Sequence, residues 1–446
     1  MTDVTLTTTP ASEPARSKSL LEIDERTKKR NAAETRFKFY GIGAIGIGVF
    51  FLVALLVSIL SNGLSAFTQT SISLPVPLVQ SEIEAAEKSI VKTSKYRDII
   101  GAVLIEKLKT AGVSTDMDSK KLLQIMSSGA PGALREFVLA NPDAIGTTVP
   151  FDFLTSSRVD GYFKGRVTRA ALAEDKNLDS AHLDIVDQLK EQGSVTSGFN
   201  WQFIFGSDAS DSRPEQAGIG VAMVGSFYMM LVVLCLALPI GVAASIYLEE
   251  FAPKNRLTDV IEVNISNLAA VPSIVFGILG LAAFIQFAHL PQSAPLVGGL
   301  VLTLMTLPTI IISTRASLQS VPPSIRDAAL GIGASKMQSV FHHVLPLAMP
   351  GILTGTIIGL AQALGETAPL LLIGMVGFIA SEYPSGVFEG FLSPNSAMPA
   401  QIYEWAKRAD PAFYERAWGG IIILLLFLMT MNIVAIILRR RFERRW

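Results

Sequence analysis

The chain has 446 residues, half of them hydrophobic and only 17% charged, and its mean hydropathy is +0.44. This composition is too apolar for a single soluble domain and indicates a polytopic membrane protein. The formal net charge of −1 gives no indication of nucleic-acid binding, and a single cysteine, Cys235, excludes a disulfide framework or a cysteine-based zinc site within one chain.

Six apolar segments are long enough for a bilayer core, which needs about 20 residues per helix. They cover residues 40–62, 218–248, 260–287, 295–314, 347–380 and 417–438. We therefore predict an all-α polytopic membrane protein with a disordered cytoplasmic tail over 1–38 and a first transmembrane helix over 39–62. A domain over 63–200, a core with five further transmembrane helices over 201–440 and a basic tail over 441–446 complete the organisation.

Basic residues set the predicted orientation. Lysines and arginines precede the first apolar segment and follow the last, and the positive-inside rule makes both ends cytoplasmic. An even number of spans agrees with that placement. Residues 63–200 then lie outside the cytoplasm, and the polar loop 324–346 lies inside it.

The segment 63–200 mixes polar and apolar residues and has the size of a small domain. Helical patterning over 83–111, and over 119–139 with a break near Pro131, is combined with β-branched and aromatic residues over 151–173. We predict a small extracytoplasmic α+β domain. His182 is isolated, and we interpret it as a structural residue without a metal ligand set around it.

The loop 324–346 carries the signals of two short helices. Ser324 with Asp327, and Ser335 with Gln338, have capping-box spacing. Glycines at 331 and 333 end the first helix, and Pro346 is expected to end the second. One face of the second helix is apolar and contains Met337, Val340, Phe341, Val344 and Leu345. Such a pair either docks a partner or lies on its own bundle or on the lipid surface.

Several residues within the predicted spans are candidates for mechanism. Gly351, Gly355 and Gly359 have the spacing that allows close helix packing. Glu366, with Thr367 beside it, is an ionisable residue in a predicted span, so it either lines or gates a pathway or is paired within the bundle. Arg315 either anchors a helix end or contacts an anion, and we prefer the anchor.

Prolines predict where these helices are irregular. Pro239, Pro272, Pro308 and Pro369 lie in or near spans, and each removes a helix hydrogen bond. We expect kinks there and a break in the run 270–277.

No G-x-x-x-x-G-K-[ST] sequence is present, so a P-loop ATP site is not expected. Two classes of function remain open. The chain is either the membrane subunit of a pump whose ATPase is a separate protein, or a secondary transporter or channel that works alone.

The loop also resembles a known motif. Asp327-Ala328-Ala329, then Gly333, then Leu345-Pro346 resembles the EAA loop of ABC importer permeases, with Asp327 in place of the usual glutamate. Residues 270–277 (AVPSIVFG) and 365–370 (GETAPL) look like segments of phosphate-importer permeases of the PstA type, and this similarity covers about residues 196–440. Gln362 departs from an arginine found there in many members. Residues 63–195 resemble an extra amino-terminal domain of some proteobacterial members.

The resemblance implies a type I ABC importer permease fold and a permease subunit of an ATP-driven importer of inorganic phosphate in the bacterial inner membrane. It implies a second permease of the PstC type, two ATPase subunits that bind ATP and Mg, and a periplasmic phosphate-binding protein as partners; this chain itself binds no cofactor. The residues from Asp327 to Pro346 quoted above would dock on an ATPase. Permeases for other oxyanions share the EAA loop, so another solute remains the alternative.

Overall fold

A computed structural model of the chain describes residues 25–110, 112, 117–172, 178–375 and 383–442. It forms two compact units, Met1–Ser58 and Ile59–Trp446. Helix α1 (Glu25–Gly63) begins well before the first apolar segment. The prediction of disorder over 1–38 is therefore wrong for residues 25–38, which are helical, whereas residues 1–24 lie outside the described residues.

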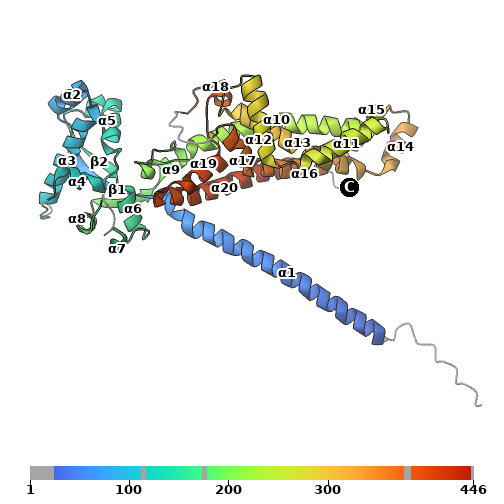
Figure 1. The fold of residues 1–446 in the computed structure, drawn as a ribbon, viewed down its shortest axis with the longest axis horizontal. Helices are drawn as coiled ribbons and strands as arrows, with labels where there is room; N and C mark the ends of the chain where they lie inside the picture. The colour runs from blue at the N-terminus through green and yellow to red at the C-terminus, as the bar shows by residue number, and fades with distance from the viewer. Residues whose placement is uncertain (1–24, 111, 113–116, 173–177, 376–382, 443–446) are drawn as a thin grey trace, which may run out of the picture. The chain divides into compact units, whose positions relative to one another are not determined.

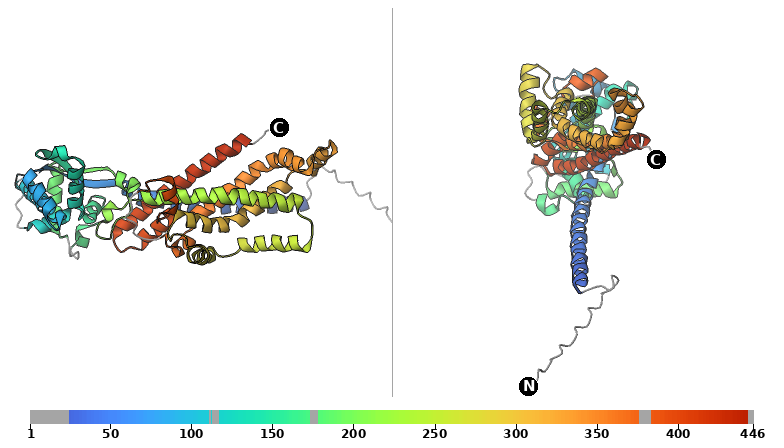
Figure 2. Two further views of the ribbon diagram at one scale, coloured as in Figure 1. Left: turned by 90° about the horizontal axis from the view of Figure 1, so that it is seen from above. Right: turned by 90° about the vertical axis from the view of Figure 1, so that its right-hand side faces the viewer.

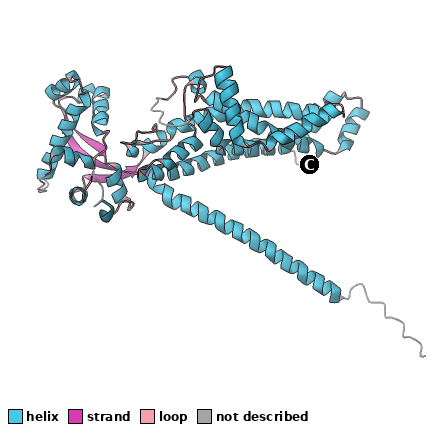
Figure 3. Ribbon diagram, viewed as in Figure 1, coloured by secondary structure: helices cyan, strands magenta, loops and turns pink. Residues whose placement is uncertain are grey.

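The domain that follows α1 combines short helices with three strands (Figure 3). In chain order its elements are η1 (Leu64–Phe67), β1 (Thr68–Pro77), α2 (Gln80–Lys88), α3 (Lys92–Thr110), α4 (Ser119–Leu122), η2 (Leu123–Ile125), α5 (Ala130–Ala140), η3 (Pro142–Ala144), β2 (Thr148–Leu154), α6 (Ser157–Phe163), α7 (Arg169–Leu172), α8 (Ser180–Glu191) and β3 (Val195–Phe199).

The strands form one antiparallel sheet in the order β2-β1-β3, with Ile72 paired to both Phe153 and Val195. Alternate residues of β1, Ile72, Leu74 and Val76, are fully buried against the helices. The prediction of strands over 151–173 is correct only as far as Leu154. After it the chain turns into α6, because its apolar Val159 and Tyr162 follow a helical period rather than a strand period.

Glu87 ties α2 to α5 and gives the domain a predictable acid sensitivity. Its carboxylate accepts from Arg135 Nε at 2.7 Å and Nη2 at 3.0 Å. The hydrogen bond from Arg135 lowers the pKa of Glu87 to about 2. Because the folded pKa lies below the unfolded value, this contribution to stability is complete above about pH 4.5 and is lost as the pH falls towards 2.

We expect Glu87→Gln to lower the thermal unfolding midpoint of the purified protein at pH 7. The difference from the wild type should shrink below pH 4.5 and vanish near pH 2, because protonation then removes the same charge. A difference that stays constant from pH 7 to pH 3 would contradict this assignment.

The described residues after β3 form helices and the loops between them (Figure 1). Its elements are α9 (Trp201–Phe205), η4 (Pro214–Gln216), α10 (Gly220–Ile246), η5 (Tyr247–Phe251), α11 (Arg256–Ala269), α12 (Ser273–Gly280), η6 (Leu281–Phe287), α13 (Pro295–Gln319), α14 (Pro323–Gly331), α15 (Lys336–Ser339), η7 (Val340–Val344), α16 (Leu345–Gly365), α17 (Ala368–Leu372), α18 (Val387–Leu392), α19 (Met398–Lys407) and α20 (Pro411–Phe442).

Among the described residues, five helical segments are long and apolar enough to cross a membrane. They are Glu25–Phe67, Gly220–Phe251, Pro295–Gln319, Lys336–Gly365 and Pro411–Arg441. The predicted segment 260–287 is not a straight helix, because α11 and the segment Ser273–Phe287 meet at an angle of 101°. The break falls at Pro272, as the run 270–277 predicted. The count reaches six if this bent pair is one span.

The other prolines differ in their effect. Pro239 and Pro308 do not break their helices, because α10 and α13 continue through them. Near Pro369 the helix is broken, as expected, so the predicted span 347–380 does not run as one helix: α16 ends at Gly365 and α17 begins at Ala368. Residues 376–380 of that span lie outside the described residues.

Helices α10, α13 and α16 run alongside one another in the core (Figure 2). Small residues make their close approach possible: Gly241 of α10 lies against Ile310 of α13, and Gly299 of α13 lies against Val232. The hydroxyl of Ser245 donates to Ile311 O at 3.1 Å across the same pair. The α10–α13 pair is therefore both closely packed and hydrogen-bonded.

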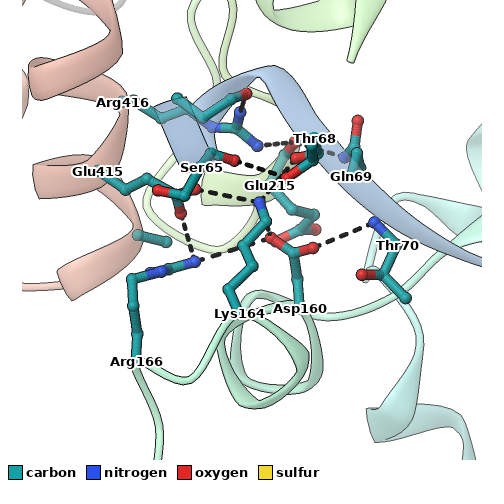
Figure 4. A network of polar contacts seen from close by, with 12 residues as sticks. Ser65, Thr68, Gln69, Thr70, Asp160, Lys164, Arg166, Glu215, Glu415 and Arg416 are labelled. Atoms are coloured by element: carbon teal, nitrogen blue, oxygen red, sulfur yellow. Dashed lines mark hydrogen bonds and ion pairs between the residues drawn. The ribbon is translucent and has the colours of Figure 1, made fainter. Parts of the chain in front are cut away.

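A buried group of charges joins the amino-terminal domain to α20 (Figure 4). We call Asp160, Lys164, Arg166 and Glu415 the junction network. Lys164 Nζ lies 2.6 Å from Asp160 Oδ2 and 3.1 Å from Glu415 Oε1, and Arg166 also pairs with Glu415. Both carboxylates are almost fully buried. An ionic group of this kind is strongly destabilised when one partner is removed.

Arg416 extends this contact to two other segments. Its guanidinium donates to Ala66 O at 2.8 Å, just after α1, and to Glu215 O at 3.0 Å, just before α10. Burial raises the pKa of the Glu215 carboxyl. The start of α20 is thus bonded to the chain segments that lead out of α1 and into α10.

Candidate functional site

The loop between α13 and α16 contains the short helices α14 and α15 separated by a glycine turn. At the end of α14, Gly333 N donates to Leu330 O and Ala334 N donates to Ala329 O. These two bonds form a Schellman motif, in which the residue after the helix cap adopts a left-handed conformation. Gly333 has φ = +92°, and this is the region in which glycine avoids the steric cost of a Cβ.

The helix starts agree with one capping prediction and contradict the other. The Ser335 hydroxyl accepts from Gln338 N at 3.2 Å and Gln338 Oε1 accepts from Ser335 N at 2.8 Å, which completes a capping box. Ser324 does not cap α14, because the helix already begins at Pro323 and its N-cap residue is Pro322. The fixed φ of proline suits a first helical position, so the two prolines set this start.

Pro346 does not end the second helix as expected. The chain passes from α15 through the π-helical turn η7 directly into α16, and Pro346 occupies the first turn of α16. Inside the continuous run Lys336–Gly365, Pro346 cannot donate the usual backbone hydrogen bond to the preceding turn, and it directly follows the π-helical turn η7, where the helix is already irregular. The second half of the loop is continuous with a membrane helix.

The predicted apolar face of the second helix is divided between two environments. Val340 and Val344 are buried in a cluster with Ile246, Leu318 and Ile352, so they hold the loop on its own bundle. Met337 and Phe341 are 58% and 44% exposed and, with Leu345, line an apolar groove of about 440 Å³ beside Tyr247 and Phe251. Val340 and Val344 thus follow the alternative in which the helix lies on its own bundle, whereas docking of a partner at Met337 and Phe341 stays a prediction.

The exposed part of α14 is of mixed character. Asp327 and Ala328 point away from the bundle, whereas Ala329 is buried. Leu330 and Ile332, 48% and 84% exposed, add apolar surface next to them. An exposed apolar patch of this kind, bordered by a carboxylate, is typical of a protein interaction site.

Arg326 is a functional candidate that the sequence reasoning missed. Its guanidinium forms an ion pair with Glu250 Oε1 at 2.7 Å and donates to the carbonyls of Leu318 and Val321 at 2.8 and 2.7 Å. The sequence does contain a signal for this pair. Arg326 comes one residue before the Asp-Ala-Ala motif, and Glu249 and Glu250 follow directly on an apolar segment.

Glu366 lies at a break between helices and not inside a span. It is the C-cap residue of α16, with an extended backbone (φ −76°, ψ 130°), and Thr367 is the N-cap residue of α17. The Glu366 side chain is half-buried, and no hydrogen bond or ion pair engages its carboxylate within the described part of the chain.

Arg315 lies at the opposite end of the bundle and already has anionic partners. Its Nη2 is 2.9 Å from Glu262 Oε1 and its Nε is 3.3 Å from Glu249 Oε2. Because α13 and α16 are antiparallel, Glu366 lies near the level of residue 303, roughly 18 Å along α13 from Arg315. The structure does not bring the two predicted pathway residues together.

The three glycines of α16 face α13. A Cβ at Gly351 or Gly355 would overlap the hydroxyls of Ser317 or Ser313, whereas a Cβ at Gly359 would make an ordinary contact with Ile310. The first two glycines therefore set the separation of these helices. Among the described residues, no group of three or more His, Cys, Asp or Glu side chains could hold a metal ion.

Comparisons with known proteins match both halves of the chain. Residues 237–446 match the model of the binding-protein-dependent transport system inner membrane component, and residues 24–173 match a domain of unknown function, DUF3333. A chain of the MetNI methionine ABC transporter in inward-facing conformations has a TM-score of 0.38 and 14% identity, covering 50% of this chain and 97% of that chain. A score at this level does not establish a common fold.

Two relatives are named as phosphate permeases. Phosphate transport system permease protein PstA 1 of Mycobacterium tuberculosis (strain CDC 1551 / Oshkosh) is 32% identical over 234 residues, which are 52% of this chain and 74% of that protein. The PstA of Yersinia pestis is 29% identical over 54% of this chain and 80% of that protein. A match of this identity over most of a relative's length shows that the chain belongs to the PstA family of phosphate transport system permeases.

Proposed function

We propose that this chain is the membrane-spanning permease subunit of an ATP-driven importer of inorganic phosphate. The observation that carries the proposal is its 32% identity to a phosphate permease across the helical half of the chain, where the loop with the EAA-like spacing lies. The exposed Asp327, Leu330 and Ile332 on that loop are suited to bind a separate ATPase.

The loop geometry supports a specific mode of coupling. Helix α14 ends in a tight glycine turn, and α15 continues into α16, so movement of the loop reaches the membrane helices through the chain itself. We infer that two ATPase subunits, which bind ATP and Mg, move α14 and α15 as they close. This movement switches the pathway between inward-facing and outward-facing states.

The same proposal covers topology and partners. We infer six spans, of which α11 and α12 form one bent span, with both termini and the loop 324–346 in the cytoplasm and the amino-terminal domain outside it; the apolar helices and the basic residues at both ends of the chain support this topology. A second permease of the PstC type completes the pathway, and a periplasmic phosphate-binding protein delivers the substrate.

Uptake of labelled phosphate into vesicles that contain the chain with its second permease and ATPase tests the proposal. We expect uptake to require ATP and to resist competition by sulfate or molybdate. ATP-independent uptake would favour a secondary transporter, and preferential uptake of another oxyanion would change the assigned substrate.

We expect Glu366→Gln to reduce phosphate uptake at least tenfold while the complex with the ATPase still assembles. A half-buried carboxylate with no partner in the described residues at a helix break is available for a role in the pathway, and one lost charge-assisted interaction corresponds to roughly a tenfold effect. Glu136→Gln, the same substitution at an exposed residue of α5 in the amino-terminal domain, is the matched control and should leave uptake unchanged. Unchanged uptake in Glu366→Gln would leave the residue a structural one.

A further inference from the structure

Two consecutive prolines leave the end of α13 without its usual hydrogen-bond donors. In a continuing helix, Leu318 O and Gln319 O would accept from the backbone nitrogens of residues 322 and 323, but both of these residues are prolines. The backbone bonds that reach Leu318 O there are short-range ones, such as the bond from Val321 N at 3.3 Å. The helix therefore needs an outside donor at this end.

Arg326 supplies that donor from the next helix. Its Nη2 donates to Leu318 O at 2.8 Å and its Nη1 donates to Val321 O at 2.7 Å. A positive charge at this position also matches the negative end of the α13 dipole. Arg326 is part of α14, so the contact fixes α14 to α13 beyond the peptide connection.

The same guanidinium fixes α14 to α10. Its Nε lies 3.0 Å and its Nη2 lies 2.7 Å from Glu250 Oε1, in the π-helical turn η5 that ends α10. The Glu250 side chain is 7% exposed and that of Arg326 is 22% exposed, so the pair is largely shielded from water. A shielded, forked pair of this kind is both strong and directional.

We propose that Arg326 is a positioning residue that transmits movement of α14 to the α10–α13 pair. This inference rests on the proposed coupling function of the loop. One planar group holds three elements: the exposed helix α14, the end of α10 and the end of α13. Because α10 and α13 are themselves closely packed and hydrogen-bonded, a force on α14 acts on both together.

Lysine cannot reproduce these contacts, because its ammonium is a single point and not a planar fork. In vesicles that contain the complete complex, we expect Arg326→Lys to lower phosphate uptake about tenfold while ATP hydrolysis stays within about twofold of the wild type. Glu250→Gln should give the same dissociation of uptake from hydrolysis, and the double variant should be no worse than either single one.

Arg256→Lys is the matched control. Arg256 is an exposed arginine at the start of α11 and makes no ion pair within the described residues, so the same substitution there should leave the ratio of phosphate imported to ATP hydrolysed unchanged. Copurification of the ATPase with each variant shows that the complex has assembled.

The outcomes separate this inference from the proposed function. A wild-type complex that imports no phosphate, or that recruits no ATPase, overturns the proposed function. A functional wild type together with a normal import-to-hydrolysis ratio in both Arg326→Lys and Glu250→Gln overturns the role of Arg326. If the loss of uptake in the double variant is the sum of the losses in the two single variants, Arg326 and Glu250 act independently. That result also overturns the role of Arg326.

Discussion

Replacing Gly333 with valine is expected to abolish ATP-coupled phosphate uptake while the protein still inserts into the membrane. The residue has φ = +92°, and a β-branched side chain in that region is a genuine outlier. The left-handed conformation costs an ordinary residue about 1–2 kcal/mol. The turn would open, and α14 and α15 would lose the relation that lets them move together.

Two controls separate backbone geometry from bulk. Gly331 also has no atom within 4 Å of an added Cβ, but its φ is not positive, so Gly331→Ala should retain uptake. Asparagine tolerates the left-handed region, so Gly333→Asn should retain a large part of the activity. Uptake is measured with labelled phosphate, and normal uptake in Gly333→Val would show that the turn has no part in coupling.

Removing the charge of Glu415 is expected to destabilise the protein by about 3–5 kcal/mol, the usual cost of breaking a buried ion pair. Glu415 is 3% exposed and pairs with both Lys164 and Arg166. Glu415→Gln keeps the size of the side chain but leaves these two cations with Asp160 as the remaining carboxylate of the junction network. The thermal unfolding midpoint in detergent should fall accordingly.

Asp98→Asn is the control for loss of a carboxylate at the surface. Asp98 lies 3.9 Å from Lys95, and both side chains are more than half exposed. Such pairs contribute about 0–1 kcal/mol, so the midpoint should barely change. Similar shifts in Asp98→Asn and Glu415→Gln would show that the junction network contributes no more than a surface pair.

The sequence predicted the long apolar helices and the break at Pro272, because hydropathy and proline act over local stretches. It also contained the alternation of Ile72, Leu74 and Val76 that marks β1, and this signal was overlooked. The error after Leu154 has a different origin. A segment of mixed β-branched and aromatic residues suits a strand or a helix, and tertiary packing decides between them.

The loop 324–346 was predictable in outline but not in its contacts. The cap at Ser335 and the turn at Gly333 depend on neighbouring residues, so spacing reveals them. The ion pair of Arg326 with Glu250 joins residues 76 positions apart in the chain, and no local pattern specifies it. The division between buried Val340 and exposed Met337 likewise depends on where the rest of the bundle lies.

Because α15, η7 and α16 are continuous, a rotation of this segment as one unit would move its two ends in opposite directions. Lys336–Gly365 has 30 residues, which gives a length of about 45 Å at 1.5 Å per residue. Its near end carries Met337 and Phe341, and Glu366 follows its far end. Suppose that the segment rotates about Gly351 and Gly355, which lie against Ser317 and Ser313. A tilt of about 5° then displaces its two ends by roughly one to three ångströms in opposite directions, because each end lies about 20 Å from the pivot. Under that condition, a small push on the near end would change which groups lie within hydrogen-bond distance of the Glu366 carboxylate.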